Sequence, residues 1–582
     1  MTRWDRRTGQ VTNVAPKPFR TGGYRTLRTA PLIFSPANPR KLYFAANTIW
    51  ETVNGGTSWK EISPDLSRRD SVVPANVGVY RTRAAATARH PGVVYAIAPS
   101  PLSERVLWAG TDDGLIHVTT DGGKAWRNVT PPSLLPWAKV SMLEASAFDV
   151  KVAYAAINTL RLDEMRPQLW RTRDGGATWT RINDGIPDGT VVNTVRADRK
   201  RRGLLFAGTE QQVFVSTDDG DHWRTLRRNM PATSIRDLWI KDDDLIAGTH
   251  GRGFWILDDI SPLRQAELPS PAAALLYAPS RATRVRNNLN TDTPLPQEEP
   301  ASPNPPEGAA IDYWLGPDVR GVVVLEVADA TGRLVRRIAS DDATEAPLPD
   351  RNIPDYWIRP FQPLASTPGM HRYVWDLRHA APRVAGATYP IAAVFGDTPR
   401  DPQGSWVGAG RYTVTLRVSG IAQVQPLEVR MDPRVRTGAA DLARAYALSR
   451  QLDSGIAQAA AALDRVHALR ALLATRLDRT RGPMAEELKA FDARLAKLQG
   501  GASGRFGAPE EPSLGRVRGE LAQLFGAVEE ADVAPTTQLV AAAREKLADL
   551  AALLATWRAA SETELTRINT LLRVSNIPEI HP

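Results

Sequence analysis

The sequence predicts a mainly β protein with an α-helical C-terminal part. Three observations support this fold class. A short turn motif repeats along the first half of the chain, strands with alternating apolar and polar residues follow, and apolar residues spaced three and four apart fill the C-terminal part. The repeat determines the architecture of the first half, because a motif that recurs at regular intervals marks copies of one structural unit.

The repeated motif is a Ser or Thr, an acidic or amide residue two positions later, a glycine two after that, and a tryptophan three further on. We call each copy a box turn. A short carboxylate or amide can accept hydrogen bonds from its own turn, the glycine permits positive φ, and the tryptophan can bury a sheet edge. We therefore predict structural roles for these residues. The copies are Thr52–Trp59 with Asn54, Thr119–Trp126 with Asp121, Thr172–Trp179 with Asp174, and Ser216–Trp223 with Asp218.

Each box turn lies among short apolar strands, such as Arg105–Thr111 and Leu115–Thr119 before the second copy. Four strands per repeat are typical of a β-propeller blade, in which the box would join the third strand to the fourth. Trp4–Val14 looks like the end of an earlier blade, and Gly248–Asp259 keeps a strand but has no box. We count about five blades and a remnant, within the usual range of closed propellers. Either the propeller closes with few blades or, as we favour, the chain is the C-terminal part of something longer.

The chain is predicted to divide into four parts. Residues 1–268 form the propeller blades, and residues 269–310 form a proline-rich linker. Residues 311–435 contain strands of period two, which indicate a small β-sandwich of immunoglobulin type. Residues 436–582 carry apolar helix faces that predict a helical bundle.

Composition excludes several classes of function. The 582 residues include no cysteine, so disulfides and thiol chemistry are excluded, and no apolar run predicts a membrane span. The net charge of +9 comes without a dense basic run, so we predict no nucleic-acid partner. We predict no cofactor and no metal site, although Thr111–Gly114 and Asp242–Asp244 leave calcium open as an alternative. The first ten residues lack the apolar core of a signal peptide.

The loops after the second strand of each blade are expected to gather at one end of the propeller, which we call the mouth. Glycoside hydrolysis needs two carboxylates about 5 to 9.5 Å apart, and Asp112 with Glu210 is a candidate catalytic pair. The alternative is that mouth loops are polar because water covers them. Arg81, Arg252, Tyr80 and Glu210 are residue types that a sialidase site needs, but their spacing matches no sialidase motif. The neighbouring loops also offer Trp137. The candidate ligand-binding residues of the mouth are Asp113, Arg161, Glu164, His250 and Arg252.

The box turns and the strands before them resemble the Asp-box (BNR) repeat propellers, which include sialidases, tandem-propeller xyloglucanases and the sortilin ectodomain. Gly110–Gly123, Gly248–Trp255 and Tyr373–Arg378 resemble most closely the long bacterial proteins called sortilin-like or "glycosyl hydrolase". The resemblance covers most of residues 1–435. It implies a propeller fold, but it is a poor guide to function. It also implies that the full-length parent begins further upstream and is secreted or periplasmic if it carries a signal peptide.

Three hypotheses follow. In the first, the protein is an exported binding or scaffold protein that recognises a peptide or glycan at the mouth, while the C-terminal helices contact another protein. In the second, it is a glycoside hydrolase of sialidase or xyloglucanase type that uses the mouth carboxylates. In the third, it is a structural module of a larger assembly.

Overall fold

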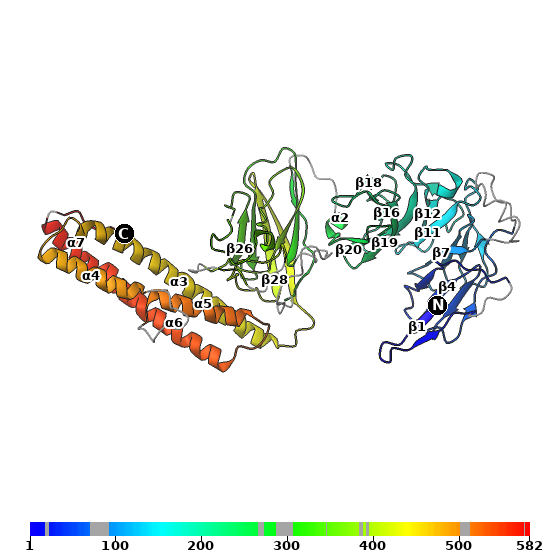
Figure 1. Cartoon of the computed structure of the whole chain (residues 1–582). Coiled ribbons are helices and arrows are strands. Elements are labelled where there is room, and N and C mark those ends of the chain that lie inside the picture. The colour runs from blue at the N-terminus through cyan, green and yellow to red at the C-terminus, as the bar shows by residue number, and fades with distance from the viewer. Residues whose placement is uncertain are drawn as a thin grey trace. The chain divides into compact units, whose positions relative to one another are not determined.

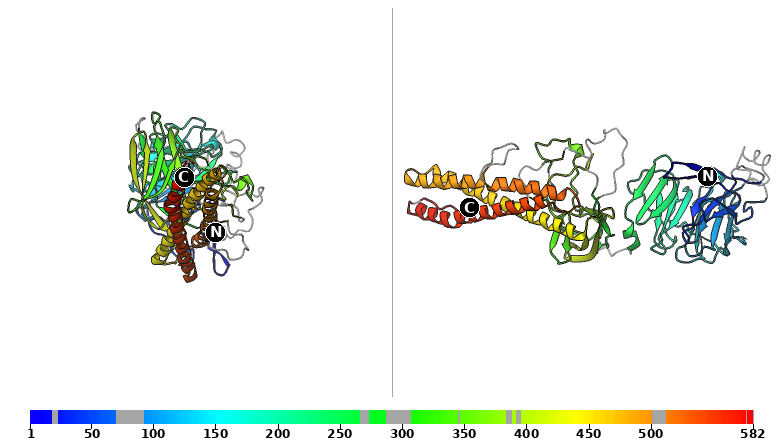
Figure 2. Two further views of the ribbon diagram at one scale, coloured as in Figure 1. Left: turned by 90° about the vertical axis from the view of Figure 1, so that its left-hand side faces the viewer. Right: turned by 90° about the horizontal axis from the view of Figure 1, so that it is seen from below.

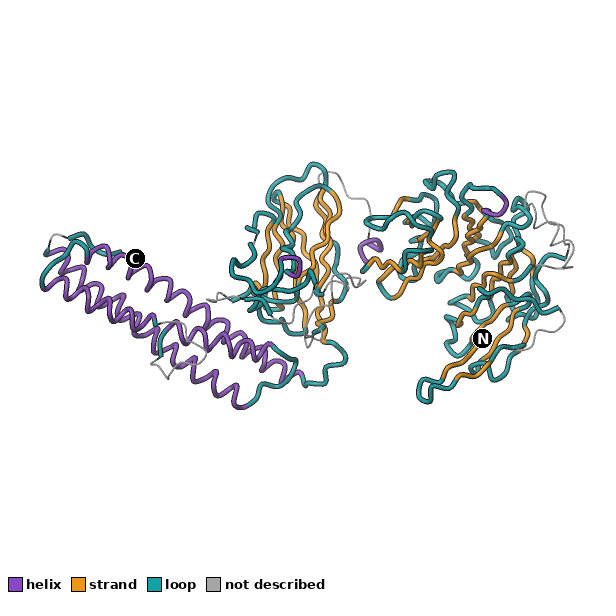
Figure 3. Tube along the Cα trace, viewed as in Figure 1, coloured by secondary structure: helices purple, strands orange, loops and turns teal. Residues whose placement is uncertain are grey.

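The computed structural model divides into two compact units, Met1–Glu267 and Leu268–Pro582, which are described separately (Figure 1). The structure describes residues 1–17, 23–69, 92–265, 273–286, 307–344, 346–382, 388–390, 395–500, 512–575 and 577–581. Strands predominate in the first unit, which has only short helical segments among its described residues, and the second unit contains both strands and long helices (Figure 3).

The described part of the first unit is a series of antiparallel sheets in chain order, each pairing its strands as they follow one another. The hairpin of β1 (Thr2–Trp4) and β2 (Val11–Asn13) comes first. The first sheet contains β3 (Leu32–Phe34), β4 (Leu42–Ala45), β5 (Ile49–Thr52) and β6 (Lys60–Glu61). The second contains β7 (Val94–Pro99), β8 (Leu107–Thr111), β9 (Ile116–Thr119) and β10 (Arg127–Asn128).

The third sheet contains β11 (Lys139–Ala145), β12 (Ala153–Asn158), β13 (Leu169–Thr172) and β14 (Thr180–Arg181). The fourth contains β15 (Val192–Ala197), β16 (Leu205–Thr209), β17 (Val213–Ser216) and β18 (Arg224–Thr225). The fifth has three strands, β19 (Ile235–Lys241), β20 (Asp244–Thr249) and β21 (Phe254–Leu257), and the short helix α2 (Ser261–Gln265) follows it.

These sheets are the blades of a β-propeller. The first strands β7, β11, β15 and β19 lie next to one another on the inside, and an apolar layer separates each sheet from the next. Alanines in the second strands, such as Ala109 and Ala155, are fully buried in these layers, which lets neighbouring sheets approach closely. The predicted propeller is therefore present in the first unit, with five sheets and a hairpin among the described residues.

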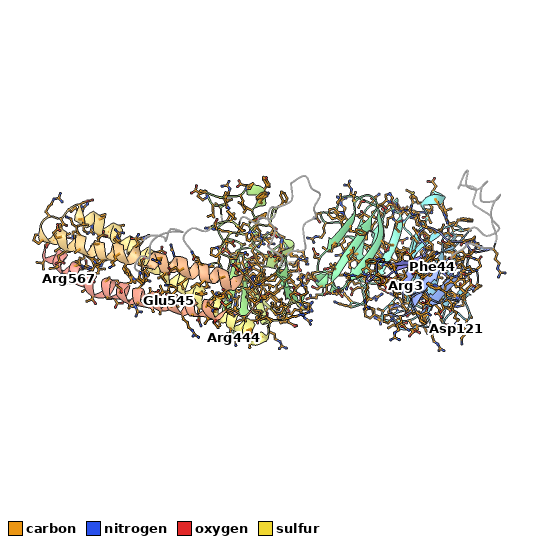
Figure 4. All side chains as sticks on the ribbon, turned by 60° about the horizontal axis from the view of Figure 1, so that its bottom comes forward. Arg3, Phe44, Asp121, Arg444, Glu545 and Arg567 are labelled. Atoms are coloured by element: carbon orange, nitrogen blue, oxygen red, sulfur yellow. The ribbon has the colours of Figure 1, made fainter. Side chains whose placement is uncertain are left out.

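Each box turn is held by its own side chains. In the second box turn, which contains the Asp121 labelled in Figure 4, Oδ1 of Asp121 accepts the Thr119 hydroxyl at 2.9 Å and the N–H groups of Lys124 and Ala125 at 2.9 and 3.0 Å. The Thr119 hydroxyl oxygen in turn accepts the Gly123 N–H at 3.0 Å. These bonds satisfy turn groups that would otherwise need water. The same pattern surrounds Asn54, Asp174 and Asp218.

Each box turn also fastens its blade to the preceding one. The indole Nε1–H of Trp126 donates to the carbonyl of Ile62, just after the fourth strand of the first sheet, at 2.8 Å. Gly123, at φ +88°, sits so close to Ile62 that an added Cβ would lie 2.5 Å from its carbonyl oxygen. The box glycine thus permits the contact and the tryptophan bonds across it. The equivalent indole bonds run from Trp59 to Val14, Trp179 to Val129 and Trp223 to Ile182.

The fourth box turn adds a pH-dependent contact. His222 Nδ1 lies 2.6 Å from Asp218 Oδ2, and this hydrogen bond, with the charge of Asp218, raises the pKa of His222. Because the pKa of His222 is higher in the folded state, protonated His222 stabilises the fold. This stabilisation is complete below the ordinary pKa of about 6.5 and is lost as the pH rises through the raised pKa. We expect the melting temperature to fall across that window, and His222→Gln to flatten the dependence. An unchanged profile would contradict this. His117 cannot cause the effect, because burial lowers its pKa to about 4.

In the second unit, two sheets face each other across one apolar core that includes Tyr313, Trp375 and Val414. One sheet has the order β22 (Ala274–Leu276), β24 (Ala309–Leu315), β27 (Gly369–Trp375). The other has the order β23 (Ala282–Arg284), β29 (Ile421–Met431), β28 (Gly410–Val418), β25 (Val324–Asp329), β26 (Leu334–Ala339). The predicted linker 269–310 needs correction here, because β22 and β23 within it are part of these sheets. Its segments 269–272 and 287–306 lie outside the described residues.

The helices of the second unit pack side by side around a second core (Figure 2). Leu452, Phe491 and Leu521, from three different helices, are fully buried in it. Gly455 permits close packing, since an added Cβ would lie 2.9 Å from Leu547. In the described part of the chain, no helix is long and apolar enough to span a membrane. The helices are α3 (Ala439–Leu477), α4 (Pro483–Gln499), α5 (Leu514–Glu529), α6 (Thr537–Arg558) and α7 (Leu565–Val574), with a π-helical segment Ala559–Glu564 before α7.

Candidate functional site

The candidate mouth residues follow the second strands β8, β12, β16 and β20, so the propeller topology brings their loops to one end. Tyr80 and Arg81, which the sequence also placed there, lie outside the described residues. The structure joins some of the other candidates in hydrogen-bonded clusters and leaves others apart.

Asp112 and Arg161 meet through Trp137. Arg161 donates from Nε and Nη2 to the Trp137 carbonyl at 2.9 and 2.8 Å, and from Nη2 to the Asp112 carbonyl. Its guanidinium lies 5.3 Å from the centre of the Trp137 ring. Trp137 adopts a φ of 68°, which is costly for a residue with a side chain and is commonest at functional sites. This cluster therefore fixes the direction of Arg161 at the mouth.

The carboxylate of Asp112 is held by its own surroundings. Its Oδ1 accepts the Val93 N–H at 2.8 Å, and its backbone N–H donates to the Val93 carbonyl at 3.0 Å. Burial raises the pKa of Asp112 despite the hydrogen bond from Val93. A carboxyl group with a raised pKa is suited to donate a proton if a substrate reaches it.

Asp113 is buried beneath the mouth and holds neighbouring loops together by hydrogen bonds. It is fully buried and accepts the Arg68 N–H at 2.8 Å and the Thr111 hydroxyl at 2.5 Å. Its backbone carbonyl accepts the Trp137 N–H at 3.0 Å. Gly92 packs against its carboxylate, where an added Cβ would overlap it. With its oxygens used in this way, Asp113 positions Trp137 and leaves no carboxylate oxygen directed at a ligand.

Glu210 belongs to a separate cluster. Its Oε1 accepts Asn193 Nδ2 at 3.0 Å and Arg236 Nη1 at 3.1 Å. Asn193 in turn accepts Asn158 Nδ2 at 2.6 Å, which links the third and fourth blades. Asp112 follows the second blade's β8 and Glu210 the fourth blade's β16, and the two side chains form hydrogen bonds with different partners. Their role as a catalytic pair stays a prediction.

The remaining candidates are outside both clusters. Glu164 forms an ion pair with Arg166, whose Nε lies 2.9 Å from Oε1, and this bonding lowers the pKa of Glu164 to about 2. His250 and Arg252 are exposed in the loop after β20, and their backbone N–H groups hold that loop by bonds to the Ser234 carbonyl and the Thr249 hydroxyl. No group of three or more His, Cys, Asp or Glu suited to a metal occurs among the residues that the structure describes.

A second cluster, not predicted from the sequence, lies at the opposite end of the propeller. A cavity of about 330 Å³ is lined there by the inner strands of all five sheets, including Phe34, Glu144 and Trp239. Arg196 bonds Glu144 at 3.1 Å and Asp237 at 2.9 Å, and burial raises the pKa of Glu144. The sequence did contain one signal for this cluster, which is the arginine within the otherwise uncharged strand Val192–Ala197.

Comparison with known proteins gives partial likenesses. No family model matches the chain. A xyloglucanase from Paenibacillus sp is 29% identical over 198 residues, which are 32% of this chain, and the match spans only 16% of the length of that enzyme. A GH74 xyloglucanase structure from Xanthomonas campestris covers 70% of this chain and 55% of its own, with 12% identity and a TM-score of 0.30. YCF48 bound to D1 peptide covers 44% of this chain and 79% of its own, with 16% identity and a TM-score of 0.26.

Proposed function

We propose that the first unit is a non-catalytic binding module of an exported protein, and that its mouth holds a peptide or glycan. The observation that supports this most is the Asp112–Trp137–Arg161 cluster. It fixes a guanidinium group at the mouth, while the carboxylates of Asp112, Asp113 and Glu210 each accept hydrogen bonds from neighbouring protein groups. A preoriented donor favours binding, because less side-chain entropy is lost when the ligand arrives. The C-terminal helices would contact a protein partner.

Peptide and glycan arrays test this proposal. Peptides or glycans that bind the wild-type chain should bind Arg161→Gln about tenfold more weakly, since a hydrogen bond to a charged group contributes about 1.5 to 3 kcal/mol. Arg105→Gln, in an exposed turn at the opposite end of the second blade, is the matched control and should bind normally. Absence of any binder, or equal loss in both variants, would contradict the proposal.

Glycoside hydrolysis is the second candidate. The partial identity to a xyloglucanase and the raised pKa of Asp112 favour it. Turnover on a glycan panel that includes xyloglucan, abolished by Asp112→Asn with Glu210→Gln, would replace the binding proposal. Turnover that survives both substitutions would place a catalytic site elsewhere.

A further inference from the structure

The five sheets offer an internal comparison of how each blade is covered. On each first strand, one apolar residue faces the preceding blade. It pairs with the same position of the second strand in every sheet, which is Phe44 in the first sheet and an alanine in the other four. In the second to fifth sheets this residue is buried, with exposed fractions of 4% for Ile97, 1% for Leu143, and 0% for Val195 and Leu238. In the first sheet it is Leu32, which is 51% exposed. The inner part of this face of the first sheet is therefore uncovered.

The fifth sheet is uncovered on its opposite face. Phe254 and Ile256 of β21 are 81% and 54% exposed. The residues that pair with the same positions of the second strand in the fourth sheet are Val213 and Val215. The fifth sheet covers them, and they are only 3% and 9% exposed. Trp239 of β19 is also exposed. Isolated exposed apolar residues are ordinary, but this face is apolar at the positions that another blade covers elsewhere in the propeller.

The hairpin β1–β2 is the outer half of a further blade. Trp59 donates to the carbonyl of Val14, just after β2, at 2.7 Å, as the other box tryptophans donate just after fourth strands. An added Cβ on Gly56 would lie 2.8 Å from Val14 Cβ, the distance at which Gly176 would meet Val129. By this equivalence β2 is a fourth strand and β1 a third strand.

This half blade covers only part of the first sheet. Met1, just before β1, packs together with Tyr24 and Trp59 on Phe44 and Trp50, which belong to the second and third strands of the first sheet. Leu32 and Phe34 of the first strand lie on the same face by register and stay exposed. In the described chain β1 pairs with β2 alone, so its other edge carries backbone groups with no strand beside them. Among the described residues, that blade has no first or second strand.

We infer that a two-stranded β segment, supplied by polypeptide outside residues 1–582, binds beside β1 and completes this blade. Its second strand would pair antiparallel with β1. Its side chains would be apolar on both faces, because Leu32 and Phe34 cover one face and Phe254 and Ile256 the other. The cavity of about 330 Å³ that the inner strands of all five sheets line includes Phe34 of the first sheet and Trp239 of the fifth, so both sheets reach it. The interface already formed by Val14 and Trp59 would thereby continue inward.

A synthetic peptide of residues 191–210 is a suitable probe, since it contains β15 and β16, the first and second strands of the fourth blade. Its control carries Val195→Asp and Phe206→Asp, which place charges on both apolar faces. We expect the wild-type peptide to bind the full chain, to raise its melting temperature and to protect the amide hydrogens of β1 from exchange. The control peptide should bind at least tenfold more weakly.

Variants of the chain locate the binding. Leu32→Glu and Ile256→Glu should each weaken peptide binding at least tenfold, while Leu102→Glu, an equally exposed leucine in a turn, should not. Unchanged melting temperatures without peptide would show that the variants fold. No binding of the wild-type peptide, or equal binding of both peptides, would overturn the inference. So would a dimer of the wild-type chain that Ile256→Glu dissociates, because a second copy would then cover the face.

Discussion

Replacing Gly123 with alanine is expected to destabilise the first unit by about 3 kcal/mol, from the left-handed φ and the crowding together. The glycine has a φ of +88°, where an L side chain is strained. Its added Cβ would also lie 2.5 Å from the carbonyl oxygen and 2.8 Å from Cβ of Ile62. That carbonyl accepts the indole N–H of Trp126, so the clash would push apart the two groups that bond neighbouring blades.

Gly122→Ala is the matched control. It is next to Gly123 in the same box turn and has a φ of +78°, but no atom lies within 4 Å of an added Cβ. It should therefore show the backbone strain alone, about 1 kcal/mol. Urea denaturation of both variants, followed by tryptophan fluorescence, measures the difference. If both variants lose the same free energy of unfolding, the backbone strain explains the whole effect and the crowding against the preceding blade adds nothing.

The box turns were the part of the fold most open to prediction from sequence. Their bonds lie within a few residues, so the spacing of Ser or Thr, Asp and Gly determines the turn. The bond from each tryptophan to the preceding blade was not predicted. Its acceptor is a backbone carbonyl many residues earlier, such as that of Ile62 for Trp126, and a carbonyl leaves no mark in the sequence.

The contacts at the mouth were harder to predict from the sequence, because they too depend on backbone carbonyls. Loop order brings Asp112 and Arg161 to one end of the propeller, but their meeting depends on the carbonyl and positive φ of Trp137. In the second unit, β22 and β23 are three residues each, too short to show a period of two within a proline-rich stretch. β23 pairs in parallel with β29, far along the chain, so no local signal marks it.

The second large effect is expected at the joint between the sheets and helices of the second unit. Asp532, just after α5, accepts hydrogen bonds from Arg284 of β23 and from Arg286 Nε at 2.9 Å. The side chains of Arg284 and Asp532 are 6% and 7% exposed. Asp532→Asn keeps the shape but leaves two arginines facing a neutral group. Removing one partner of a buried ion pair costs about 3 to 5 kcal/mol.

The consequence should be visible in how the second unit unfolds. Glu529 stabilises the same joint. Its carboxylate accepts hydrogen bonds from the backbone N–H of Trp406 at 3.1 Å and from the Ser449 hydroxyl at 2.5 Å. Weakening Asp532 should therefore loosen the helices from the sheets, so that ellipticity at 222 nm and near-ultraviolet ellipticity cease to change together on heating. Glu530→Gln, at an exposed neighbouring position, should leave the transition unchanged. A single transition in Asp532→Asn with a loss below about 1 kcal/mol, the range of an exposed pair, would show that Glu529 and the apolar contacts hold the joint without Asp532.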